Sequence, residues 1–197
     1  MTKQIINRVT VFCASSSKID PHYTESAYNL GKMLANAGIE LIYGGGKVGL
    51  MGAVSSGSLD AGGTVIGVIP EFMKNLELGR KDIAELRVVP DMHERVKMLI
   101  EDSDMLIALP GGVGTFDELM QAIAWKTLGL IVKPILLVNT KNYFKHIINA
   151  LEDAEVQGFM HVANTNLWHA LSTPEDVLQY ISRIQQNVNT IVAQSIG

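Results

Sequence analysis

A turn almost without side chains joins an apolar strand to a helix in this 197-residue chain. Residues 109–118 read LPGGVGTFDE, after a short apolar run and before residues that have helical spacing from Phe116 onward. Glycines let another molecule approach the backbone, and the free N–H groups at a helix start favour an anion. The turn therefore predicts a phosphate site at Gly112, Gly114 and Thr115.

A second turn of the same design lies upstream. Residues 40–43 read as a strand, residues 44–49 form the turn GGGKVG, and a helix opens at Leu50. Two such turns in one small domain indicate a nucleotide that is held at more than one place. The upstream candidates for substrate contact are Gly44, Gly45, Gly46 and Gly49.

The upstream turn also allows a dinucleotide-binding interpretation. Gly44, Gly46 and Gly49 match G-x-G-x-x-G, and Glu71 follows at a spacing suited to a ribose hydroxyl. In an ordinary NAD domain the turn between the first strand and the first helix carries this fingerprint, whereas here that turn is ASSS at residues 14–17. An NAD-dependent oxidoreductase is therefore an alternative. No Gly-Lys-Ser/Thr follows the turn, which excludes a Walker A loop.

Apolar strand-like runs alternate with helix-like stretches along the whole chain. This alternation predicts an α/β fold, with a doubly wound, mostly parallel Rossmann-like sheet and helices on both faces, in a single domain spanning residues 1–197. The strands are expected at residues 9–14, 40–43, 64–69, 86–89, 105–109 and 134–138, and the helices at 21–37, 49–61, 92–102, 116–128 and 144–155. The polar residues 71–85 are expected to form either a surface lid or short irregular helix over the site, or an ordinary solvated loop.

Composition excludes several classes of function. Lys and Arg form no block and the net charge is −4, so no nucleic-acid partner is expected. No apolar run is long enough to cross a membrane, and residues 1–7 lack the layout of a secretion signal, so a cytoplasmic location is expected. The single cysteine, Cys13, lies in a strand-like run and is expected to be a packed small residue and not a nucleophile.

The C-terminal segment carries apolar residues at helical spacing. They predict a helix at about residues 174–193 whose apolar stripe completes the core or forms an interface. The stripe consists of Val177, Ile181, Ile184, Val188 and Ile191.

Two charged residues are candidates for catalysis. Arg95 falls at the start of a helix directly after a strand, where a cation is poorly placed for the helix dipole. Glu118 lies three residues after Thr115, and a carboxylate there could act in catalysis. The same Thr-x-x-Glu spacing is typical of a capping box, in which the two side chains only satisfy backbone donors.

These motifs together resemble the Lonely Guy family of cytokinin riboside 5′-monophosphate phosphoribohydrolases. The resemblance covers residues 9–159 and is carried by three elements in the family's order: PGGxGTxxE at 110–118, GGGxxGLMG at 44–52 and MHxR at 92–95. Relatives often carry the label possible lysine decarboxylase. No lysine of this chain is marked out for a pyridoxal phosphate Schiff base.

The resemblance implies hydrolysis of the N-glycosidic bond of a purine nucleoside 5′-monophosphate to free base and ribose 5-phosphate, by a homodimer or larger homo-oligomer. It requires no metal ion and no organic cofactor. It assigns Arg95 and Glu118 to catalysis, Glu118 stabilising the cationic sugar or activating water and Arg95 supporting the departing base. Besides the upstream glycines, it assigns to substrate binding Glu77, Gly112, Val113, Gly114 and Thr115. A non-catalytic molybdenum cofactor carrier on the same fold is the other alternative.

Two positions depart from the family pattern. The family usually has Arg-Lys in the catalytic helix, whereas this chain has Arg95-Val96 with Lys97 one place later, which turns the lysine by about 100°. Plant members often have a threonine where this chain has Ala124. These departures leave the preference for cytokinin nucleotides open, with plain AMP as the alternative preferred substrate.

Overall fold

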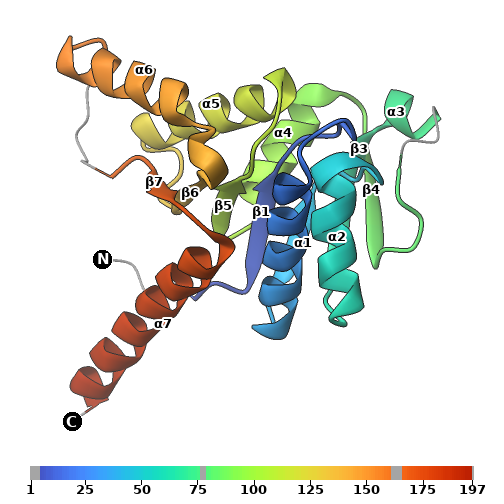
Figure 1. The fold of residues 1–197 in the computed structure, drawn as a ribbon. Coiled ribbons are helices and arrows are strands. Elements are labelled where there is room, and N and C mark those ends of the chain that lie inside the picture. The colour runs from blue at the N-terminus through green and yellow to red at the C-terminus, as the bar shows by residue number, and fades with distance from the viewer. Residues whose placement is uncertain (1–4, 76–78, 161–165, 197) are drawn as a thin grey trace.

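The fold is a seven-stranded parallel sheet between two layers of helices (Figure 1). The structure is a computed structural model and describes residues 5–75, 79–160 and 166–196. In the sheet the strands follow the order β4-β3-β2-β1-β5-β6-β7, and every neighbouring pair is parallel. The strands are β1 (Arg8–Phe12), β2 (Glu40–Tyr43), β3 (Val65–Pro70), β4 (Glu85–Val89), β5 (Met105–Ala108), β6 (Ile135–Val138) and β7 (His169–Leu171). The predicted fold class is confirmed.

Helices cover both faces of this sheet and bury a separate core on each. On one face α1 (Pro21–Asn36), α2 (Gly49–Asp60) and the start of α7 (Pro174–Ile196) pack on the sheet. On the other face lie α4 (Met92–Glu101) and α5 (Val113–Thr127), with α6 (Lys145–Val156) beside them. Strands covered on both faces are apolar throughout, which is why they read as continuous apolar runs.

The order of the strands reverses between β1 and β5. From β1 the chain runs outward to β4, and it then returns to the other side of β1 with β5. Ligands of open α/β sheets bind beyond the carboxyl ends of the strands at such a switch point. The turns that follow β1 and β5 therefore define where a site is expected.

Several elements differ from the predicted ones. Helix α5 begins at Val113, three residues before Phe116, and the short strand β7 and the 3-10 helix η1 (Thr140–Asn142) were not expected. The expected short helix in residues 71–85 is present as α3 (Glu71–Asn75). The C-terminal helix is confirmed, and its first apolar residues, Val177 and Ile181, complete the core.

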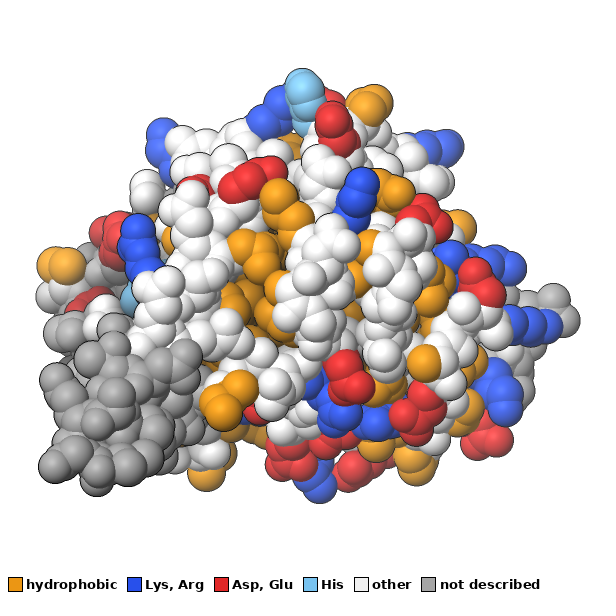
Figure 2. Space-filling model, turned by 90° about the horizontal axis from the view of Figure 1, so that it is seen from below, with side chains coloured by type: hydrophobic (Ala, Val, Ile, Leu, Met, Phe, Trp, Pro, Cys, Tyr) orange, Lys and Arg blue, Asp and Glu red, His pale blue; other side chains and the backbone are white. Residues whose placement is uncertain are grey.

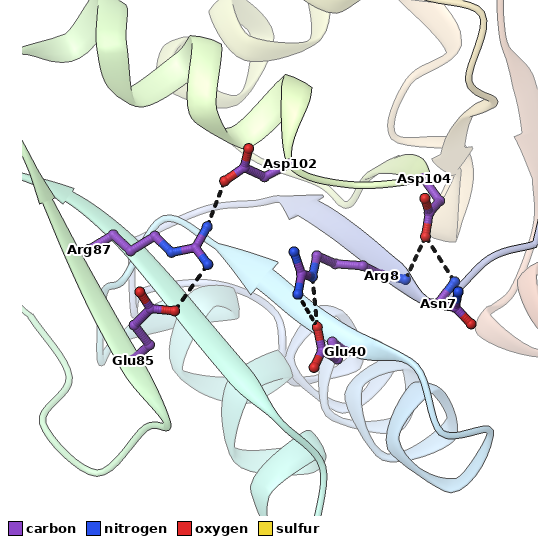
Figure 3. Close-up of polar contacts among 7 residues, drawn as sticks. All are labelled: Asn7, Arg8, Glu40, Glu85, Arg87, Asp102 and Asp104. Carbon is purple, nitrogen blue, oxygen red and sulfur yellow. Dashed lines mark hydrogen bonds and ion pairs between the residues drawn. The ribbon is translucent and has the colours of Figure 1, made fainter.

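Charged residues form ion pairs at the amino ends of the strands, opposite the switch point (Figure 3). Arg8 pairs with Glu40 on the next strand at 2.6 Å, and Arg87 of β4 pairs with Asp102 at the end of α4, also at 2.6 Å. Figure 2 shows this end of the molecule, where acidic and basic side chains lie next to one another. These charges are at least partly exposed, so each pair contributes about 1 kcal/mol or less.

No helix in the described part of the chain is both long and apolar enough to span a membrane.

Candidate active site

A cavity of about 330 Å³ opens at the switch point, beyond the carboxyl ends of β1 and β5. One wall is the turn after β1, from Cys13 to Ser16, and the facing wall is the start of α5, from Gly112 to Thr115. Arg95 of α4 and Glu118 of α5 lie at its base. Three methionines complete the lining: Met51, Met73 and Met92.

The start of α5 presents unfilled backbone donors to this cavity. The first hydrogen bond of the helix runs from the N–H of Phe116 to the carbonyl of Gly112 at 3.0 Å, and no side chain caps the helix. The N–H groups of Val113, Gly114 and Thr115 thus have no acceptor within the helix. An ideal Cβ on Gly112 or Gly114 would meet nothing within 4 Å, so the space beside the backbone is open. This arrangement suits a phosphate group.

Arg95 and Glu118 form a buried ion pair, although they lie on different helices. Nη1 of Arg95 is 2.6 Å from Oε1 of Glu118, and each residue is only 4% exposed. The guanidinium also donates from Nε to the carbonyl of Val68 at 3.1 Å and from Nη2 to the carbonyl of Gly44 at 3.4 Å. Arg95 is therefore fixed by the ends of β3 and β2 and in turn fixes the carboxylate of Glu118.

The ionisation of the buried acids follows from their surroundings. Desolvation raises the pKa of Glu118, and the charge and hydrogen bond of Arg95 oppose this effect only in part. Burial also raises the pKa of Cys13 well above its ordinary value, and the nearby Glu118 carboxylate adds to the rise. Cys13 is therefore a protonated thiol, which agrees with its expected role as a packed residue.

The capping-box interpretation of Thr115 and Glu118 is wrong. Because α5 begins at Val113, Thr115 is the third residue of the helix, and Gly112 occupies the cap position. Glu118 is already in the second turn, where a side chain cannot reach the free N–H groups at the helix start. Its carboxylate bonds to Arg95 instead.

The upstream glycines are not among the residues that line the cavity. A Cβ on Gly44 would overlap Nη2 of Arg95, and a Cβ on Gly49, whose φ is +62°, would overlap the carbonyl oxygen of Ser16. The N–H of Met51, at the start of α2, donates to the carbonyl of Ala14 at 3.2 Å, so this helix start is partly filled by protein. Substrate contact through Gly44, Gly45, Gly46 and Gly49 stays a prediction.

The remaining positions singled out in the sequence are Glu77, the neighbours Val96 and Lys97, and Ala124. Glu77 lies outside the described residues. Val96 is buried in the core beneath α4, and Lys97 is half exposed and 3.9 Å from Glu94, so α4 brings no lysine to the cavity. Ala124 is exposed on α5, away from the cavity.

Sequence reasoning missed the three methionines. They lie on α2, α3 and α4, which meet only in the folded chain. Methionine is flexible and polarisable and packs well against aromatic rings, so it suits the binding of a flat base. One expectation from the sequence pointed to one of these methionines: residues 71–85, which include Met73, were expected to cover the site.

Known proteins match this chain along most of its length. The family model described as possible lysine decarboxylase matches residues 51–181. A cytokinin riboside 5′-monophosphate phosphoribohydrolase of Rhodococcoides fascians is 42% identical over 77% of this chain and 77% of its own length. One of Arabidopsis thaliana is 41% identical over 81% of this chain and 74% of its own length.

Among solved structures, the molybdenum cofactor binding protein of Rippkaea orientalis has the same fold. It matches 91% of this chain and 97% of its own chain, with a TM-score of 0.69 and 25% identity. The motifs, the geometry of the cavity and these similarities agree with one another. The chain belongs to the Lonely Guy family of cytokinin riboside 5′-monophosphate phosphoribohydrolases, which the family model describes as possible lysine decarboxylases.

Proposed function

We propose that this protein hydrolyses the N-glycosidic bond of a purine nucleoside 5′-monophosphate, either AMP or a cytokinin nucleotide, and releases the free base and ribose 5-phosphate. The observation that carries the proposal is the buried Arg95–Glu118 pair beside the open start of α5. A site that only binds a phosphate needs the helix start but has no need of a buried carboxylate.

The 5′-phosphate binds at the start of α5. The free N–H groups of Val113, Gly114 and Thr115 donate hydrogen bonds to the dianion, and the helix dipole adds to the attraction. Glu118 lies one turn further along the same helix, at the base of the cavity. Anchoring the phosphate therefore holds the sugar against the carboxylate and reduces the entropic cost of the reaction.

Cleavage of the bond between C1′ and the purine nitrogen develops positive charge on the sugar and negative charge on the base. The Glu118 carboxylate stabilises the cationic sugar and takes a proton from water as the water oxygen bonds to C1′. The base leaves with the bonding electron pair and takes up one proton, and the proton on Glu118 returns to solvent. Net, one water molecule is consumed.

Arg95 has two tasks in this scheme. It holds the Glu118 carboxylate in one orientation and favours its ionised form. Three of the five guanidinium donors are used by Val68, Glu118 and Gly44. The other two have no acceptor among the described residues and are available to support the departing base.

A homodimer or larger homo-oligomer in the cytoplasm is part of the proposal. Large apolar side chains are exposed in the segment after α5, where Leu128, Leu130 and Val132 are 66–76% exposed. Exposed apolar residues close together on a monomer are typical of a contact surface. A closed dimer would use the same surface on both copies.

The alternatives fit this cavity less well. Lysine decarboxylation through pyridoxal phosphate needs a lysine for the Schiff base, and the described lining of the cavity contains none. An NAD-dependent oxidoreductase would use the fingerprint glycines to approach the dinucleotide. In this chain these glycines pack against Arg95, Met51 and the backbone of Ser16. A non-catalytic molybdenum cofactor carrier has no need of the Arg95–Glu118 pair; the Rippkaea orientalis protein, which has the same fold, is named a molybdenum cofactor binding protein.

Product analysis tests the proposal directly. Purified protein is incubated with AMP, with N6-isopentenyl-AMP and with NAD, and the free base and ribose 5-phosphate are quantified. Equal amounts of base and ribose 5-phosphate from either monophosphate are expected. Tight binding of nucleotide without release of base would favour a carrier, and reduction of NAD in the presence of a hydroxylated substrate would favour an oxidoreductase.

A further inference from the structure

The glycine-rich turn after β2 contacts one member of the catalytic pair, Arg95. Gly44 follows the last residue of β2 and is not among the residues that line the cavity, and its carbonyl accepts a hydrogen bond from Nη2 of Arg95 at 3.4 Å. A Cβ at Gly44 would overlap this same nitrogen. The guanidinium thus occupies the space that any other residue at position 44 would fill with its side chain.

We propose that Gly44 is a positioning residue for catalysis: its missing side chain leaves the space in which the Arg95 guanidinium sits, and through Arg95 it holds Glu118 in its reactive orientation. This role rests on the proposed function of Glu118. It differs from the expected role of the turn, in which the glycines contact the substrate phosphate.

The contacts around Arg95 show why a small displacement matters. Its guanidinium is held between the carbonyls of Val68 and Gly44 on one side and the Glu118 carboxylate on the other. Arg95 is only 4% exposed, so the loss of any of these acceptors leaves a buried donor with little access to water. Moving Nη2 away from Gly44 must therefore also change the 2.6 Å contact between Nη1 and Glu118.

Gly44 is well suited to a test by substitution, because its backbone conformation does not require glycine. Its φ is not positive, unlike that of Gly45 at +78°, so alanine fits the local conformation. The atoms that a new methyl group would meet are the ends of flexible side chains, Nη2 of Arg95 and Cε of Met51. Gly44→Ala is therefore expected to move Arg95 and to leave the fold intact.

The charge on Glu118 gives a readout that does not depend on turnover. The charged and titratable groups that face it are Arg95 from α4, Cys13 from the end of β1 and its own neighbour Asp117. Arg95 is the one cation among them, and it lowers the pKa of Glu118 against the effect of burial. Displacing the guanidinium is expected to raise the pKa of Glu118 further.

The experiment measures the pKa of Glu118 by carboxyl-carbon NMR, assigned with Glu118→Gln, in the wild type, Gly44→Ala and Gly46→Ala. Gly46→Ala is the matched control, because its methyl group would meet Sδ of Met51 at 2.9 Å and its nearest contacts include no atom of Arg95. A higher pKa in Gly44→Ala alone is expected. An unchanged pKa in Gly44→Ala, or an equal rise in both variants, would overturn the role. Neither outcome depends on which reaction the protein catalyses.

Turnover provides the second arm. Gly44→Ala is expected to lower kcat for AMP roughly 10- to 100-fold near neutral pH. This is less than the roughly 100- to 10,000-fold contribution of a general base, because the carboxylate is still present, and the rate should recover as the pH rises. In an Arg95→Met background, Gly44→Ala should lower kcat no further, because the nitrogen atom that it displaces is gone. A rise in KM from Gly44→Ala in both backgrounds would instead mean contact with the phosphate and would contradict the proposal.

Arg95→Lys keeps the test decisive should Gly44→Ala not fold. Lysine has no atom at the position of Nη2, so Arg95→Lys combined with Gly44→Ala is expected to fold as well as Arg95→Lys alone. If the combined variant also failed to fold, Gly44 would be needed for a reason other than Arg95, and the positioning role would be wrong.

Discussion

Nη1 of Arg95 lies 2.6 Å from Oε1 of Glu118, and both side chains are almost completely buried although 23 positions separate them in the chain. The two residues come from helices α4 and α5, and the contact joins them at the base of the cavity. A buried charge needs a partner, so each residue of the pair depends on the other. This dependence leads to the predictions on pH and stability.

The pH dependence of turnover should report Glu118. Burial raises its pKa, and the carboxylate is the active form, so kcat should rise with pH through a value above the ordinary glutamate pKa of about 4.3. The measurement is kcat at saturating AMP, because protonation of the substrate phosphate acts mainly on binding. An acid limb at or below pH 4 would mean that Glu118 is not the titrating group.

Removing Arg95 should destabilise the protein in a pH-dependent manner. Arg95→Met leaves a buried carboxylate unpaired, which costs about 3–5 kcal/mol when Glu118 is ionised. The folded-state pKa of Glu118 then lies further above its unfolded value, so stability is retained at acid pH and is lost as the pH rises through the folded pKa. Urea unfolding at several pH values checks this. Adding Glu118→Leu should remove most of the pH dependence, and its persistence in that double variant would point to another group.

The 5′-phosphate should be essential for efficient turnover. Adenosine lacks the charge-assisted hydrogen bonds at the start of α5, each of which contributes about 1.5–3 kcal/mol. Two such bonds correspond to a loss of at least about 100-fold in kcat/KM relative to AMP. Steady-state rates with both substrates measure this ratio. Comparable values for AMP and adenosine would rule out the phosphate site.

The protein should be a homo-oligomer at micromolar concentration. Exposed Leu128, Leu130 and Val132 provide an apolar surface, and α7 extends beyond the core that Val177 and Ile181 complete. Light scattering should give a mass of at least twice the 21.5 kDa of one chain. A mass of one chain would contradict this expectation.

Much of the fold could be predicted because its strands are buried on both faces. Such strands appear as apolar runs between glycine turns, and the amphipathic helices between them imply parallel connections. The strand β7 was missed because its three residues are only partly buried and give no apolar run. The start of α5 was predicted too late because Val113 and Gly114 read as part of the glycine-rich turn, whereas in the structure they are the first two residues of the helix.

The site was predicted in part. The sequence marked Arg95 and Glu118 separately, but no spacing rule relates residues on two helices, so their direct pairing needed the structure. Local spacing suggested a cap for Glu118, and tertiary contact with Arg95 decided otherwise. The glycines after β2 predicted a phosphate turn, which stays a prediction, and the structure shows in addition that Arg95 lies against Gly44. Close packing and ligand contact both require glycine, so the sequence could not separate them.

Turnover by Glu118→Gln tests the central claim most directly. Glutamine keeps the shape of glutamate and can still accept a hydrogen bond from Arg95, but it cannot act as a base or stabilise a cationic sugar with a full charge. Release of base from AMP should fall about 100- to 10,000-fold in kcat, while circular dichroism shows a folded protein at the assay temperature. Near-normal release of base by folded Glu118→Gln would contradict the account and move the chemistry to another residue.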